Sequence, residues 1–230
     1  MKLNIRDLLE YFDIKKSTEK GDVTATISVV GEDLGAALFR HYCEKEHGSI
    51  VKIIDANKEI PKTGATNSKW LDRWIVENNK GKQTLFQTEI KSWCSRSVGG
   101  LNVPIDISEH DLLESVRRNW KENVSEIDDS KENRLNKVLI KMNKGDGDIK
   151  GAYKQEPLLI FWDARNPSNG IDCFNRYDIK PKYFDFDYCW VFSCSLYLRE
   201  LYGKGEREFN VDIPNAERRL TDLFRIFKIK

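Results

Sequence analysis

The sequence of 230 residues predicts a single α/β domain spanning residues 1–230. Segments with apolar residues at helical spacing alternate with short runs of β-branched and aromatic residues, and no repeat or clear linker separates them. The length is sufficient for one well-buried core. A hydrophobic content of 40% and a charged content of 33% are typical of globular proteins.

The first half of the chain predicts helices around a strand and a β-hairpin. We expect helices over residues 4–12 and roughly 30–46, followed by a strand in SIVKIIDANKEIP that Pro61 ends. The hairpin pairs KWLDRWIV with TLFQTEIKSW, and the polar segment ENNKGKQ between them predicts a loop longer than two residues. Ser108 and Asp111 then resemble a capping box that opens a helix over residues 109–127.

The second half predicts further strands and helices that complete the same domain. PLLIFWDA is typical of a buried strand, and FDYCWVFSCSLYLRELYG predicts a strand that runs into a helix. The final helix begins near Pro214 and places Ala216, Leu220, Leu223, Phe224 and Phe227 on one apolar face.

Composition and charge argue against several classes of protein. No apolar run reaches the roughly 20 residues that span a bilayer, so we expect no membrane association and a cytoplasmic location. The net charge of +1 indicates no global basic field. The five cysteines form no CxxC and predict reduced, buried thiols, and the histidines show no ligand spacing with cysteine, which disfavours a zinc site.

The hairpin carries the residues most indicative of chemistry. Side chains alternate along a strand, so Glu89 and Lys91 share one face, and Asp72 on the neighbouring strand meets them in a suitable register. Mg²⁺ prefers hard oxygen ligands, which the carboxylates of Asp72 and Glu89 and the carbonyl of Ile90 supply. Lys91 is then placed to orient or deprotonate a water molecule, or to neutralise charge on a phosphate.

These residues resemble the PD-(D/E)XK nuclease superfamily. The resemblance covers about residues 29–127 and implies a restriction-endonuclease-like core, a central mixed β-sheet flanked by helices, with residues 128–230 as additions. Asp72 and the triplet Glu89-Ile90-Lys91 match its motif, and Glu32 matches the acidic residue on the preceding helix better than its neighbour Asp33. Leu71 stands where many members have proline.

The motif is short, and an alternative interpretation of it stays open. The chain has five [DE]-x-K triplets, but only Glu89 lies in a strongly strand-like run after a partner strand that carries an acid. In the alternative, Glu89 and Lys91 form a solvated ion pair on an exposed face of a sheet. Candidate substrate-binding residues around the motif are Gln87, Ser97, Arg117 and Arg118.

The resemblance implies a Mg²⁺-dependent deoxyribonuclease with Glu32, Asp72, Glu89 and Lys91 at its centre, in which Mn²⁺ can substitute. Members of this size serve restriction, phage defence or DNA repair. DNA is the expected substrate, RNA is the open alternative, and self-association or a partner subunit would assist a chain of near-neutral charge. The rival hypothesis is a non-catalytic, nuclease-like subunit that binds nucleic acid or a protein partner.

Overall fold

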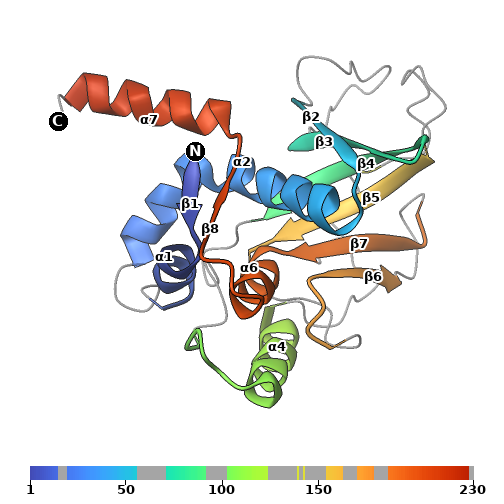
Figure 1. Ribbon diagram of the computed structural model, residues 1–230, viewed down its shortest axis with the longest axis horizontal. Coiled ribbons are helices and arrows are strands. Elements are labelled where there is room, and N and C mark those ends of the chain that lie inside the picture. The colour runs from blue at the N-terminus through green and yellow to red at the C-terminus, as the bar shows by residue number, and fades with distance from the viewer. Residues whose placement is uncertain are drawn as a thin grey trace.

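A computed structural model describes residues 1–14, 20–55, 71–91, 103–123, 139, 142, 154–162, 170–178 and 186–227 (Figure 1). The first half contains β1 (Lys2–Asn4), α1 (Ile5–Leu9), the π-helix η1 (Glu10–Ile14), α2 (Lys20–Glu46), β2 (Ile50–Asp55), β3 (Arg73–Asn79), β4 (Lys82–Lys91) and α4 (Glu109–Asn123). The second half contains β5 (Lys154–Phe161), β6 (Phe174–Asp178), β7 (Tyr188–Ser193), α6 (Cys194–Gly203), β8 (Glu208–Asn210) and α7 (Pro214–Phe227).

A six-stranded mixed sheet of order β2-β3-β4-β5-β7-β6 forms the centre of the fold. Strands β2, β3 and β4 form an antiparallel meander. Strand β5 lies parallel to both β4 and β7, and β6 closes the far edge antiparallel to β7. The predicted α/β class and the central mixed sheet flanked by helices are therefore confirmed.

Two hydrophobic clusters cover the two faces of this sheet. The long helix α2 lies across one face, where Phe39 packs against Phe86 and Phe192. Gly35 permits the closest approach, because a Cβ there would lie 3.0 Å from Ile90 Cγ2. The other face carries the second cluster, which includes Leu71, Trp74, Leu85, Leu139, Met142, Leu159 and Phe161.

The loop between β3 and β4 is shorter than the sequence predicted. Asn79 pairs with Lys82, so only Lys80 and Gly81 form the turn. Both residues have positive φ, 50° and 84°, as a type I′ turn requires. The prediction of a longer loop is wrong because the polar residues on both sides of the turn belong to the strand ladder.

Other elements extend beyond the predicted bounds. Helix α2 begins at Lys20, well before residue 30, and the hydroxyl of Tyr11 lies 2.7 Å from Thr26 Oγ1 on this early part. Strand β6 and the small β1–β8 sheet were not predicted. The predicted strand before the hairpin is present as β2, and its expected continuation over residues 56–60 lies outside the described residues.

Helix α7 begins at Pro214 as predicted, but its apolar face is only partly packed. Ala216 is buried, whereas Phe224 and Phe227 are 52% and 67% exposed. Figure 1 shows the helix extending from the body of the protein beyond α2. Among the described segments, none of the helices combines the length and the apolar character needed to cross a bilayer.

The cysteines agree with the predicted reduced, buried thiols where the structure describes them. Cys43, Cys173 and Cys189 are free and buried, and Cys194 is buried as well. Cys94 lies outside the described residues.

Candidate functional site

The end of the β3–β4 hairpin positions Asp72 beside the Glu-x-Lys triplet. Arg73 pairs with Thr88, so the next step of the same register aligns Asp72 with Glu89. Asp72 itself lies one residue before β3. Its Oδ2 accepts a hydrogen bond of 2.7 Å from the backbone N–H of Ile90. The carboxylate of Asp72 thus continues the hydrogen bonding between the two chain segments and is fixed against β4.

Glu89 and Lys91 project from β4 on the side of the second hydrophobic cluster. Their partners in β5 are Leu159 and Phe161. The side chain of Glu89 is fully buried, and its Oε1 accepts a hydrogen bond from Lys91 Nζ. The same Nζ lies 3.8 Å from Asp72 Oδ2. The two carboxylates therefore meet around one ammonium group. The Glu89–Lys91 ion pair of the alternative interpretation is present, but the burial of Glu89 contradicts a solvated pair on an exposed sheet face.

Glu32 and Asp33 approach the same end of the hairpin from helix α2. Arg73 connects the two elements, because its Nη1 donates to the backbone oxygen of Asp72 at 2.6 Å and to Glu32 Oε2 at 3.3 Å. Its Nη2 donates to Asp33 Oδ1 at 2.7 Å. Asp33 is buried and also pairs with Arg219. Asp33 is thus committed to two arginines, whereas the side chain of Glu32 is 51% exposed.

The electrostatic environment of Glu32 also connects it with the hairpin. Partial burial raises the pKa of Glu32, and the negative charge of Asp72 raises it further. Arg73 opposes this shift. The geometric link between the two acids is Arg73, whose Nη1 contacts both the Asp72 backbone oxygen and Glu32 Oε2.

The predicted substrate-binding residues are placed less clearly. Gln87 is buried, and its Nε2 donates to Gln155 Oε1 at 2.9 Å. Arg117 is exposed and pairs with Glu114 on α4, and Arg118 is exposed on the same helix. Ser97 lies outside the described residues. Substrate contacts by these four residues stay predictions, as does metal ligation by the Ile90 carbonyl.

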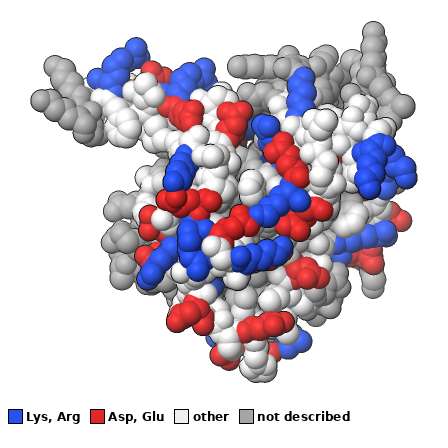
Figure 2. All heavy atoms as spheres, viewed as in Figure 1, with Lys and Arg blue, Asp and Glu red and all other residues white. Residues whose placement is uncertain are grey.

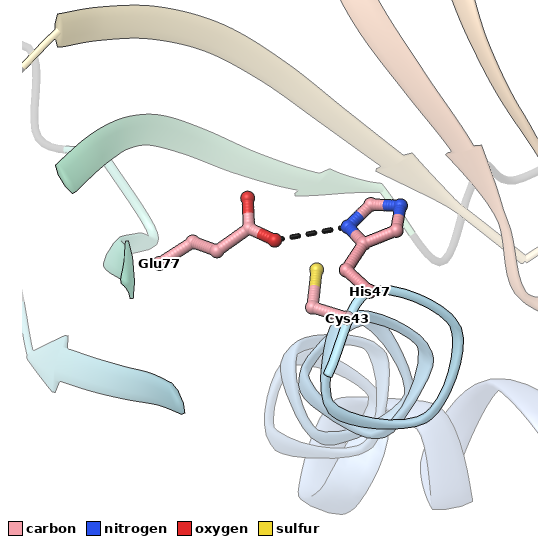
Figure 3. A group of neighbouring side chains, drawn as sticks. All are labelled: Cys43, His47 and Glu77. Carbon is pink, nitrogen blue, oxygen red and sulfur yellow. Dashed lines mark hydrogen bonds and ion pairs between the residues drawn. The ribbon is translucent and has the colours of Figure 1, made fainter. Parts of the chain in front are cut away.

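A second group of chemically active side chains was missed in the sequence. Cys43 near the end of α2, His47 one residue after the helix and Glu77 on β3 place their ligand atoms within 4.8 Å of one another, and Figure 3 shows the three side chains pointing toward one another. His47 N–H donates to the Cys43 carbonyl oxygen, so the four-residue spacing places both side chains on one side of the helix end, and this spacing was the available signal. Burial, with a contribution from Glu77, raises the pKa of the Cys43 thiol. Cys43 and His47 therefore weaken the expectation, drawn from the sequence, that cysteine and histidine form no metal site.

The surface seen in Figure 2 shows basic and acidic side chains interspersed over this face, in keeping with the net charge of +1. The hairpin cluster is therefore the basis for proposing an activity. No protein-family model, no curated protein and no solved structure matches this chain.

Proposed function

We propose that the chain is a Mg²⁺-dependent nuclease that hydrolyses phosphodiester bonds in DNA. One observation carries the proposal: Asp72 and Glu89 come from neighbouring segments and meet around Lys91 Nζ, while Arg73 links Glu32 to the backbone of Asp72. An acid on a helix, an acid at the hairpin and a Glu-x-Lys triplet are the residues that the PD-(D/E)XK resemblance implies. Among the described elements, the helix α2, the strand meander β2-β3-β4 and the helix α4 follow one another in the order that this resemblance implies, which supports the proposal.

The donor set suits the proposed cation. Asp72 and Glu89 offer hard carboxylate oxygens, which Mg²⁺ prefers, and both already contact a single positive group. Both Asp72 and Lys91 keep about a fifth of their side-chain surface exposed, 18% and 19%, so the cluster is open to small ligands. When bound, the ion would offset the negative charge that develops on a phosphodiester under attack.

The side chains around the proposed cation would have different roles in the reaction. Lys91 supplies an ammonium donor that orients a water molecule or contacts a phosphate oxygen. Arg73 holds the Asp72 backbone and the two acids of α2 in one arrangement. Glu32, with its raised pKa and half-exposed side chain, is the group best placed to exchange a proton with solvent. The buried thiols of Cys43, Cys173 and Cys189 support the cytoplasmic location proposed for such an enzyme.

A plasmid-cleavage assay with Mg²⁺ or Mn²⁺ tests the proposal. We expect Asp72→Asn and Lys91→Met to lower the rate at least about 100-fold, the scale for removing a group that stabilises the transition state. The matched controls are Asp187→Asn and Lys82→Met, which alter exposed residues, Lys82 at the opposite end of the strand that carries Lys91. Cleavage at the wild-type rate by both site variants would refute the assignment. A parallel assay on RNA decides the substrate class.

The second candidate function is a non-catalytic, nuclease-like subunit. The observation that favours it is the contact of Lys91 with both carboxylates, which partly balances their charge without a metal. A subunit of this kind would bind DNA in a gel-shift assay without cutting it, and Mg²⁺ would not change its melting temperature. Cleavage that is lost in the site variants excludes this function.

A further inference from the structure

The group of Cys43, His47 and Glu77 lies where helix α2 ends against strand β3. Gly48 has a φ of +62° and ends the helix, and the N–H groups of His47 and Ser49 donate to the Cys43 carbonyl oxygen at 3.1 and 3.3 Å. Glu77 reaches the helix end from the sheet, as Figure 3 shows. The end of the helix therefore brings a thiol and an imidazole together, and the sheet adds a carboxylate.

The geometry of the group suits a small cation. Glu77 Oε1 lies 2.9 Å from His47 Nδ1 and 2.7 Å from Ser49 Oγ, so one carboxylate oxygen is already oriented towards the imidazole. All three potential ligand atoms lie within 4.8 Å of one another. Ligands of a tetrahedral Zn²⁺ lie about 3.5 Å apart, given bonds of roughly 2.0–2.3 Å. Small side-chain rotations would bring ligand atoms that lie up to 4.8 Å apart to the spacing that Zn²⁺ requires.

The burial of the three residues leaves one side of the group open. Cys43 is fully buried and Glu77 nearly so, whereas the side chain of His47 is 31% exposed. His47 and Glu77 also line a cavity of about 620 Å³, together with Thr84, Glu156 and Trp190. A cation can enter from this cavity, and a fourth ligand can approach from it.

We propose that Cys43, His47 and Glu77 bind one Zn²⁺, with the fourth position open to the cavity. Thiolate, imidazole and carboxylate are the donors that zinc uses in proteins, and three protein ligands with one open position are typical of zinc sites that hold a water molecule. Binding replaces the thiol proton of Cys43 with the metal, and that proton passes to solvent.

This site is separate from the proposed nuclease site. Glu77 projects on the α2 face of the sheet, because side chains alternate and Ile75 on that face belongs to the cluster under α2. Trp74, which belongs to the opposite cluster, marks the face of Asp72. Glu77 and the Asp72–Glu89 pair therefore lie on opposite faces and near opposite ends of strand β3, and either proposal can fail without the other.

Titration of the metal-free, reduced full-length protein with Co²⁺ tests the proposal. We expect one equivalent of Co²⁺ to produce thiolate-to-cobalt charge-transfer absorption in the near ultraviolet, and Zn²⁺ to abolish it. Cys43→Ser should lose this absorption, whereas Cys189→Ser, at a buried cysteine in the other cluster, should retain it. Asp72→Asn should retain it too, which separates this site from the hairpin site.

Two further variants keep the test decisive if Cys43→Ser does not fold. We expect His47→Gln and Glu77→Gln to weaken Co²⁺ binding at least about tenfold, with the folded state checked by circular dichroism. A folded wild-type protein without the charge-transfer absorption would overturn the proposal. Unchanged Co²⁺ affinity in both variants would also overturn it and leave the three residues as a hydrogen-bonded link between α2 and β3.

Discussion

Gly35 gives the sharpest test of how helix α2 lies on the sheet. It sits one turn after Glu32, directly over Ile90, the central residue of the Glu-x-Lys triplet. A Cβ built on Gly35 would lie 3.0 Å from Ile90 Cγ2 and 3.3 Å from Ile160 Cγ2. Gly35→Ala therefore adds one methyl group at the contact that positions the helix over the candidate site.

The expected effect is the difference between two opposing terms. Replacing glycine with alanine inside a helix stabilises it by about 1 kcal/mol. Overpacking a closed core costs about 1–3 kcal/mol. Ile90 and Ile160 are β-branched, stiff at χ1 and almost fully buried, so neither can easily move aside. We expect the packing cost to dominate and Gly35→Ala to lower the free energy of unfolding by about 1 kcal/mol, or about 2–4 °C in melting temperature.

Chemical and thermal denaturation of two variants measures this effect. Gly203→Ala is the matched control, because it lies in α6 and its added Cβ would meet no atom within 4 Å. We expect this control to be neutral or slightly stabilising. If Gly35→Ala is as stable as Gly203→Ala, the close approach of α2 to Ile90 is wrong, and the placement of Glu32 near Asp72 loses its support.

Two further predictions concern the charges of the site. Without divalent cations, Lys91→Met should lower the free energy of unfolding by about 3 kcal/mol, because the buried Glu89 loses its ammonium partner. Added Mg²⁺ should restore part of the melting temperature of this variant. If the variant melts at the wild-type temperature without Mg²⁺, the ion pair is contradicted. Glu32→Gln should match the wild type in stability below about pH 4.5, the ordinary pKa of glutamate. At neutral pH the variant should be slightly more stable than the wild type, because a raised pKa in the folded state means that ionisation of Glu32 destabilises the folded protein. Solvent screening keeps this gain in stability small. Thermal denaturation from pH 3 to 8 measures it, and identical stability profiles of the variant and the wild type would contradict the raised pKa.

The sequence predicted the fold best where local patterns decide the structure. The β7–α6 transition and the start of α7 at Pro214 follow from short-range periodicity and the preference of proline for a first helical turn. Residues 157–161 of strand β5 form a continuous apolar run, typical of a strand buried on both faces. These features need no knowledge of distant contacts.

Contacts between distant segments account for what the sequence did not reveal. The β1–β8 sheet joins residues from the two ends of the chain, with Leu3 paired to Phe209. No local sequence pattern predicts such a pairing. Glu77 is an unremarkable polar residue of the hairpin until β3 places it against Cys43 and His47. The spacing of that cysteine and histidine was readable, but the third side chain came from the sheet.

The candidate site itself depends on a turn whose length the sequence pattern predicted wrongly. An antiparallel pair that sets Asp72 opposite Glu89 must have its centre between Lys80 and Gly81, and these two residues form the observed turn. A shift of one residue would turn the side chains of β4 to the other face of the sheet and bury Glu89 under α2. Gly81, with its φ of 84°, suits the turn type that excludes such a shift. The convergence of two carboxylates on Lys91 is thus a consequence of turn chemistry about ten residues away, which makes the register of this hairpin a precondition of the proposed activity.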